Sequence, residues 1–242
     1  MPRPNPPRAD AVVITCEHGG KRIPSAFRDL FRGRQAQLDS HRGYDPGALA
    51  MARQLARAFD APLVFSTVSR LLIELNRSPA HKQQFSDATR ALPDDIRERI
   101  VARYYTPYRE QVEALARRSI AHGRRVIHIS SHSFTPELDG EVRTADVGLL
   151  YDPRRSGERA LCDRWKKSFA ALAPELRVRR NYPYAGDSDG LTRYLRSLFP
   201  ASKYVGIELE LNQKIALSGG RRWVMLKETV VGSLQNSLQR PR

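Results

Sequence analysis

Two histidines in this chain of 242 residues stand where apolar, strand-like runs end. His18 follows the run 11–16 and precedes two glycines, and His132 ends the run 126–132. Ligands of open α/β sheets bind at the carboxyl ends of the strands, so we expect both imidazoles to face one crevice. Imidazole is a common zinc ligand, and a catalytic zinc takes three protein ligands and a water. The pair therefore predicts a metal site that needs one further ligand.

The third ligand has two candidates in the segment His41-Arg42-Gly43-Tyr44-Asp45-Pro46. Asp45 is the preferred ligand, although its carboxylate could equally cap a helix expected over 45–60. The two roles are compatible because a capping position holds a carboxylate in place. His41 is the alternative ligand. His18, Asp45 and His132 are thus the predicted ligands of one zinc ion per chain.

Two glutamates near the end of a later strand are candidates for a general base. In the run 204–211, the two-residue period of a strand places Glu208 and Glu210 on the same face. Acids in such a position are costly to bury unless they bind a cation or exchange a proton. A glutamate beside a metal-activated water can take its proton and later deliver it to a leaving amine. The residues alone leave both glutamates open.

Substrate-binding candidates flank the apolar run 71–75. Arg70 precedes this run, and Asn76 and Arg77 follow it. A guanidinium group binds a carboxylate through two parallel hydrogen bonds, and an amide adds a directional donor or acceptor. These three residues therefore predict a cradle for a substrate carboxylate. Surface arginines without such a role are the alternative in a chain this rich in arginine.

The remaining candidates for chemistry are interpreted as core residues. Cys16 and Cys162 are far apart and in no metal-ligand spacing, which suits a reducing compartment. Cys16 precedes His18 by two residues but lies inside the strand, so we expect a buried thiol and not a nucleophile. His128, in the middle of a strand, is expected to be a hydrogen-bonded core histidine.

Strands and helices must alternate along the chain to bring these segments together. We expect a proline-rich arm over 1–10 and one domain over 11–242. Within the long helix expected over 93–122, Pro107 should cause a kink or a split, and Gly123 should end it. The other expected strands cover 63–67, 145–151 and 176–179, and the other expected helices cover 156–172, 191–198 and 221–238. This alternation predicts a single three-layer α/β/α domain with a mainly parallel mixed sheet.

The composition limits the partners that we expect. The net charge is +15, and most of the 41 basic residues are arginines, which fits acidic ligands or nucleic acid. The arginines are spread along the whole chain without a nucleic-acid-binding motif, so nucleic acid is not an expected partner. No apolar run approaches the roughly 20 residues that span a bilayer. With no secretory signal pattern either, the sequence predicts a cytoplasmic protein without a membrane partner and leaves its oligomeric state open.

Taken together, these segments resemble the N-formylglutamate amidohydrolase family. The resemblance implies a phosphorylase/hydrolase-like α/β/α fold related to zinc carboxypeptidases and aspartoacylases. It also implies hydrolysis of a small N-acyl amino acid that carries a carboxylate, such as N-formyl-L-glutamate. The matching pieces are Glu17-His18-Gly19-Gly20, His41-Arg42-Gly43-Tyr44-Asp45-Pro46-Gly47-Ala48, Ser69-Arg70 through Asn76-Arg77, Ser131-His132-Ser133 and Glu208-Leu209-Glu210-Leu211-Asn212-Gln213.

The resemblance also suggests roles for individual residues. His18 and His132 match the metal histidines, and Glu210 matches the catalytic glutamate. The residues that look like the substrate-carboxylate group are Arg70, Asn76 and Arg77. Asp45 has no counterpart, because the related carboxypeptidases carry their acidic ligand three residues after the first histidine, where this chain has Lys21. Asp45 as a ligand therefore remains an inference from the residues.

The predicted function is that of a zinc-dependent amidohydrolase. Glu210 would take a proton from a metal-activated water, and Arg70 together with the zinc would stabilise the oxyanion. Asn76 and Arg77 would hold the substrate carboxylate. A related zinc amidase or carboxypeptidase acting on peptide or cell-wall fragments is the alternative among enzymes. A metal-free basic domain that binds nucleic acid is the alternative outside enzymes.

Overall fold

A six-stranded sheet forms the middle layer of the chain, in the strand order β2-β1-β3-β8-β6-β7. A computed structural model describes residues 10–239, so the predicted arm over 1–10 lies, except for Asp10, outside the described residues. Strands β1, β2, β3 and β8 are parallel, β6 is antiparallel to β8, and β7 is parallel to β6. The predicted mainly parallel mixed sheet is confirmed. The strands are β1 (Ala11–Cys16), β2 (Leu63–Phe65), β3 (Val126–Phe134), β6 (Val147–Leu150), β7 (Val178–Arg180) and β8 (Tyr204–Asn212).

The two long central strands, β3 and β8, pair along their whole length. Every residue of β3 is buried, and in β8 only Glu208 is partly exposed. Strands covered on both faces read as near-continuous apolar runs, which is why these segments were recognisable in the sequence. Their parallel register places His132 directly beside Glu210.

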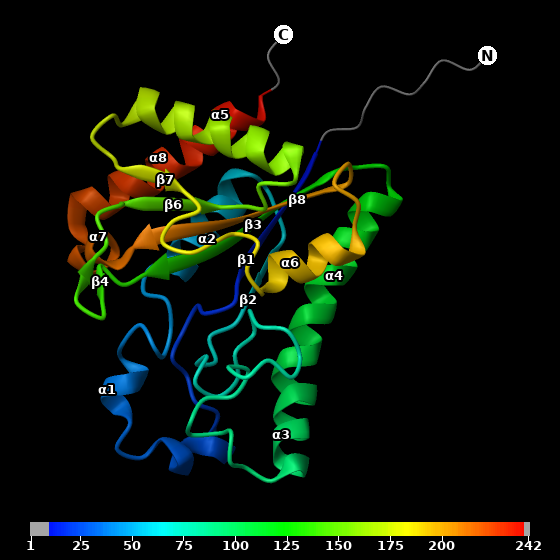
Figure 1. Cartoon of the computed structure of the whole chain (residues 1–242), viewed down its shortest axis with the longest axis vertical. Helices are drawn as coiled ribbons and strands as arrows, with labels where there is room; N and C mark the ends of the chain where they lie inside the picture. The colour runs from blue at the N-terminus through cyan, green and yellow to red at the C-terminus, as the bar shows by residue number, and fades with distance from the viewer. Residues whose placement is uncertain (1–9, 240–242) are drawn as a thin grey trace.

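Helices cover both faces of the sheet, as Figure 1 shows. On one face, α2, α5 and α8 pack their apolar stripes around the largest buried side chains, which include Trp165 and Phe169. On the other face, α4 and α6 enclose a second core. The predicted three-layer arrangement is confirmed. The helices named here are α2 (Ala48–Ala58), α4 (Thr106–Ala121), α5 (Ser156–Leu172), α6 (Leu191–Leu198) and α8 (Gly220–Leu238).

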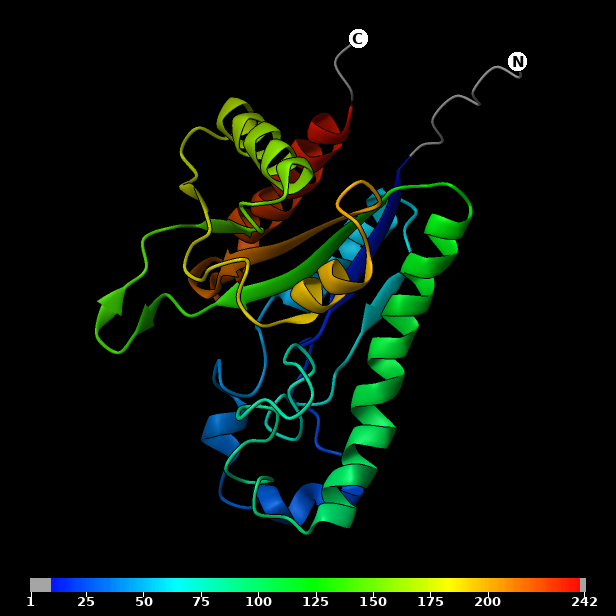
Figure 2. The same cartoon turned by 45° about the vertical axis from the view of Figure 1, so that its right-hand side comes forward.

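A long helical rod runs along one side of the molecule (Figure 2). It consists of α3 (Asp94–Ile100), a π-helical turn over Val101–Tyr105 and α4. Pro107 lies in the first turn of α4, where a kink or a split was expected, and the helix type changes from π to α just before it while the rod continues without a gap. Gly123 ends the rod with a positive φ of 76°, as predicted.

Two expectations about secondary structure are wrong. Helix α2 begins at Ala48 after Gly47, which has a left-handed conformation, so Asp45 does not cap it. The run 71–75 is irregular rather than a strand, although four of its five residues are apolar and buried. Its apolar residues pack into the second core from consecutive turns, and burial alone does not distinguish such a segment from a strand.

Long connections leave the carboxyl ends of β1 and β2 and form the lower part of the molecule in Figure 2. They include a 3₁₀ helix over Ser25–Phe31 and the short helix α1 (Gln35–Leu38). The sequence patterns did not predict α7 (Gln213–Ser218) or the hairpin of β4 (Glu137–Leu138) and β5 (Glu141–Val142). Among residues 10–239, no helix is long and apolar enough to cross a membrane.

Candidate active site

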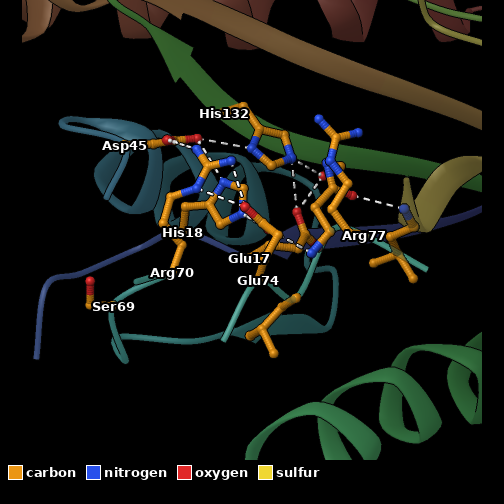
Figure 3. A network of polar contacts seen from close by, with 12 residues as sticks. Glu17, His18, Asp45, Ser69, Arg70, Glu74, Arg77 and His132 are labelled. Carbon is orange, nitrogen blue, oxygen red and sulfur yellow. Dashed lines mark hydrogen bonds and ion pairs between the residues drawn. The ribbon is translucent and has the colours of Figure 1, made fainter. Parts of the chain in front are cut away.

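The structure brings the three predicted metal ligands together at the carboxyl ends of β1 and β3 (Figure 3). The Nδ1 atom of His18 lies 3.2 Å from Asp45 Oδ2, and the Nδ1 atom of His132 lies 2.9 Å from the same oxygen. The two imidazole rings are 5.0 Å apart between centroids. One donor atom from each of the three residues lies within 4.8 Å of the other two, and all three side chains are buried. Segments 27 and 87 residues apart thus meet around one small space.

The Nε2 atom of each histidine contacts a buried glutamate that the sequence patterns did not predict for this site. The Nε2 atom of His132 lies 2.9 Å from Glu17 Oε2, and the Nε2 atom of His18 contacts Glu74 Oε1. Both Nδ1 atoms are therefore directed to Asp45. Carboxylates in this outer position fix the orientation and the tautomer of metal-binding histidines.

Each carboxylate oxygen of Glu17 also accepts a hydrogen bond from a hydroxyl group. The hydroxyl groups of Tyr108 and Ser130 donate hydrogen bonds to its two oxygens at 2.7 and 2.6 Å. Tyr108 reaches this carboxylate from α4, and Ser130 reaches it from β3. Because a buried carboxylate is stable only when its oxygens are paired, this network joins the end of β1, helix α4 and strand β3 around His132.

The loops that carry the ligands are joined by backbone contacts. The Asp45 N–H donates to the carbonyl oxygen of His18 at 2.9 Å. Gly19 and Gly20 pass so close to the chain after β2 that a Cβ atom would lie 2.8 Å from the carbonyl oxygens of Ser66 and Thr67, respectively. Both positions are thus restricted to glycine by a close backbone approach.

Glu210 differs from Glu208 in its burial and in its hydrogen bonding. It is buried, and no group among residues 10–239 pairs with its Oε2 atom. Burial, with the negative charges of Asp45 and Glu208 adding to it, raises the pKa of Glu210 to about 8. The alternative, Glu208, is half-buried and accepts a hydrogen bond from Thr192 at 2.6 Å. An unpaired buried carboxyl next to the histidines distinguishes Glu210 from its neighbour.

Charge balance within the cluster favours a bound cation. Burial opposes ionisation of His132, but its hydrogen bonds to Asp45 and Glu17 hold its pKa well above the usual range. Burial likewise opposes a charged His18, whose pKa is raised by Glu74 and Asp45. Asp45, despite its burial, has a pKa below its usual range because of both histidines. Each imidazole thus lies between two buried carboxylates, whose negative charge a divalent cation would balance.

The donor set fits a divalent metal ion of the zinc type. Two imidazole Nδ1 atoms and one carboxylate oxygen are a set that zinc accepts in catalytic sites with an open fourth position. The unpaired oxygen of Glu210 lies beside this set and not within it. The alternative ligand His41 does not belong to the cluster. It is only partly buried and lies at the outer side of Arg70.

The three predicted substrate-binding residues lie beside the cluster, and each makes a contact within the protein. Arg70 donates to Glu74 Oε2 at 2.8 Å and to Asp45 Oδ1 at 3.3 Å, so it bridges the inner and outer carboxylates. The Oδ1 atom of Asn76 accepts a hydrogen bond from the backbone N–H of Leu191 at 2.8 Å, which leaves its NH₂ group as the donor. Arg77 donates to a backbone carbonyl on the loop before α6.

The predicted site residues surround one cavity of about 220 Å³. The seven predicted site residues line it: His18, Asp45, Arg70, Asn76, Arg77, His132 and Glu210. Glu208 also lines this cavity. The loop 184–189 adds residues that the sequence did not single out, among them Tyr184 and Asp189. The cavity therefore places three side chains that could hold a cation next to the unpaired carboxyl of Glu210 and the polar groups of Arg70, Asn76 and Arg77.

Two further expectations concern residues outside this chemistry, and both are confirmed. Cys16 is completely buried, and burial raises the pKa of its thiol well above the usual range. His128 is enclosed between Thr15 Oγ1 at 2.8 Å and the Tyr204 hydroxyl at 2.6 Å. Neither residue lines the cavity.

Glu17 and Glu74 carried a weak signal that could have indicated their role. Each is an acid inside or at the end of an otherwise apolar segment, and a buried acid requires a partner. The sequence does not tell which histidine that partner is. Tyr184 carried no such signal, because it lies in an irregular loop far along the chain.

Comparison with known proteins places these features in a family. Residues 10–217 match the N-formylglutamate amidohydrolase family. A gene product, Atu2144 from Agrobacterium tumefaciens, has a similar structure with 27% sequence identity and a TM-score of 0.81, and 95% of this chain and 90% of that chain are covered. N-formylglutamate amidohydrolase from Ralstonia eutropha JMP134 is 19% identical with a TM-score of 0.65, covering 96% and 94% of the two chains, and at this identity it shows the fold alone.

No curated protein sequence matches the chain. The family match nevertheless covers most of the 242 residues and includes every predicted site residue, so the resemblance noted in the sequence is confirmed. The chain belongs to the N-formylglutamate amidohydrolase family and is an amidohydrolase.

Proposed function

We propose that this amidohydrolase cleaves the amide bond of an N-formyl or N-acyl amino acid, such as N-formyl-L-glutamate, with the aid of one zinc ion per chain. His18, Asp45 and His132 hold the metal, and Glu210 is the general base. Arg70, Asn76 and Arg77 bind the substrate. The observation that carries this proposal is the unpaired, buried Glu210 carboxyl next to three convergent metal-ligand side chains in one cavity.

A bound divalent cation would supply a lowered pKa for the attacking water and a positive charge beside the scissile carbonyl oxygen. The residues of the chain perform the remaining work. Glu210 Oε2, which has no other partner among the described residues, accepts the proton of the water. The same carboxyl then returns this proton to the leaving nitrogen, so Glu210 ends the reaction in its starting state.

The guanidinium group of Arg70 stabilises negative charge on the amide oxygen. Three of its five N–H groups are occupied, two by Glu74 and one by Asp45, which fixes the plane of the group. The remaining N–H groups can donate to a substrate oxygen without reorganisation, which is the condition for efficient electrostatic stabilisation. Asn76, through its NH₂ group, and Arg77 hold the substrate carboxylate.

Two measurements test this function. Elemental analysis of protein purified without chelators should find about one zinc ion per chain. A panel of N-formyl, N-acetyl and peptide substrates, assayed for released formate, acetate and free amine, should show hydrolysis of an N-acyl amino acid. Cleavage of internal peptide bonds or of cell-wall fragments, with the N-acyl group left in place, would instead support the related zinc amidase or carboxypeptidase.

Two variants separate the metal site from the base. His132→Ala should lose both metal and activity, whereas Glu210→Gln should retain the metal and lose turnover by about 100-fold or more. Glu208→Gln is the matched control, because it removes the same charge from the same face of β8. Full activity of Glu210→Gln together with loss of turnover in Glu208→Gln would move the base to Glu208.

A further inference from the structure

A second cavity of about 430 Å³ opens directly outside the active-site cavity. The two cavities share the side chains of Arg70, Arg77 and Tyr184. We call the outer cavity the vestibule, defined by His41, Arg42, Arg70, Arg77, Arg90 and Tyr184. It is larger than the active-site cavity, so it can hold a group at least as large as the one that is cleaved.

The acids of the vestibule are already paired, whereas part of its positive charge is not. Glu74 is bound by Arg70 and His18, and Asp87 pairs with Arg90 at 3.4 Å. The side chain of Arg42 is exposed and has no hydrogen-bond or ion-pair partner among residues 10–239. The vestibule therefore presents an uncompensated positive charge next to the catalytic groups, which attracts anions.

A buried arginine behind the vestibule adds to this charge. Arg143 is only 9% exposed, and within the described part of the chain it pairs with no carboxylate. Its guanidinium group donates to the hydroxyl of Tyr184 at 3.0 Å and lies 5.1 Å from the centre of the same ring. Keeping an arginine buried without a counter-ion is costly. Arg143 does not itself line the vestibule, but Tyr184, which accepts its hydrogen bond, does.

The position of His41 indicates that these cations converge. Burial lowers the pKa of His41, and the nearby guanidinium groups of Arg70, Arg42 and Arg143 lower it further. These groups come from three segments: the connection before α2, the irregular segment after β2 and the residue that follows β5. The hydrolytic chemistry proposed above uses only Arg70 among them.

We propose that the vestibule is a second anion-binding subsite, and that the chain acts on N-acyl peptides or extended N-acyl amino acids whose leaving portion carries a further carboxylate beyond the one at Arg77. Arg42 is the principal contact, with His41 and the Arg143–Tyr184 pair beside it. Because Arg77 and Tyr184 line both cavities, a substrate held by the inner cradle can continue past them into the vestibule. This inference rests on the proposed hydrolysis of an N-acyl amide.

Two probes of equal size test the subsite. N-formyl-glutamyl-glutamate and N-formyl-glutamyl-glutamine differ by one negative charge and have side chains of the same shape. The wild-type enzyme should prefer the first probe about tenfold in kcat/KM, mainly through KM, because a charge-assisted hydrogen bond is made in the ground state as well. Added salt should reduce the preference.

Arg42→Gln should remove most of this preference, and Arg42→Lys should restore part of it. The matched control is Arg57→Gln, which removes the same charge from an exposed position on α2 and should keep the preference. Equal kcat/KM for the two probes in the wild type would overturn the inference. An equal loss of preference in Arg57→Gln would also overturn it, because general surface charge would then account for the effect.

Failure of the proposed function can be distinguished from failure of the subsite. If no formylated probe is hydrolysed, calorimetric binding of the dipeptides glutamyl-glutamate and glutamyl-glutamine decides the question. Glutamyl-glutamate should bind more tightly than glutamyl-glutamine, and Arg42→Gln should abolish this difference. That result would support the anion-binding subsite even though the enzyme catalyses a different reaction. No difference between the dipeptides would refute the subsite.

Discussion

Replacing Glu210 by glutamine should stabilise the metal-free protein, and the gain should increase with pH. The folded protein holds the pKa of Glu210 at about 8, above its ordinary value of 4.5, because the carboxyl is buried without a partner for Oε2. A group whose pKa is raised on folding favours the folded state only while it is protonated. The wild type therefore loses stability as the pH rises from 4.5 to 8, and Glu210→Gln does not.

The size of this effect follows from the pKa values. Each pH unit between the ordinary and the raised pKa costs about 1.4 kcal/mol. The penalty should therefore reach about 3 kcal/mol at pH 7 and about 5 kcal/mol above pH 8. For a chain of 242 residues, 1 kcal/mol corresponds to about 2–4 °C in Tm, so the gain at pH 7 is on the order of 10 °C.

The assay is thermal unfolding of chelator-treated wild type and Glu210→Gln at several pH values from 5 to 9. The other titrating groups are the same in both proteins, so the difference between the two curves reports Glu210 together with its coupling to Asp45, Glu208 and His132. Glu208→Gln is the control, because Glu208 is half-buried and bonded to Thr192, and its gain should be smaller. Zinc should reduce the gain in Glu210→Gln, since a nearby cation favours the charged carboxylate.

A difference in Tm that stays constant from pH 5 to 9 would refute this reasoning. Glu210 would then titrate alike in the folded and the unfolded chain, and the buried, unpaired carboxyl that carries the proposed base would not exist. A gain that falls as the pH rises would show that Glu210 is ionised and paired in the metal-free protein.

Two other predictions concern the support of the site. Glu17→Gln should weaken zinc binding by about 10–100-fold, measured by competition with a chromophoric chelator, because the carboxylate orients a metal ligand. His128→Asn, a buried change earlier on the same strand, should leave the zinc affinity unchanged, and an equal loss there would point to general disruption of β3. Gly148→Ala should destabilise the fold by about 1–3 kcal/mol in denaturant unfolding, because its Cβ would lie 2.0 Å from the Tyr182 carbonyl oxygen. Gly157→Ala, whose Cβ meets nothing closer than 3.4 Å, should cost less than that, and the reverse order would contradict the packing described here.

Local patterns in the sequence were sufficient for most of the secondary structure. The run 126–132 and the helix over 191–198 could be recognised because burial on both faces and helical periodicity repeat within a few residues. The run 71–75 could not be classified, since its apolar residues pack from consecutive turns into a core that other segments complete. The start of α2 was misplaced because Asp45 has the pattern of a cap while its carboxylate faces two histidines.

For the site, the sequence by itself determined that His18, His132 and Glu210 lie near the carboxyl ends of strands, where parallel sheets bind small molecules. Only the tertiary structure decided that Asp45 joins the two histidines and that Glu17 and Glu74 stand behind them. The physical reason is that strand and helix patterns arise from neighbours along the chain, whereas a buried charge is stabilised by whichever partner the fold supplies. For Glu17 that partner network includes Ser130, 113 residues away, and no local pattern records such a distance.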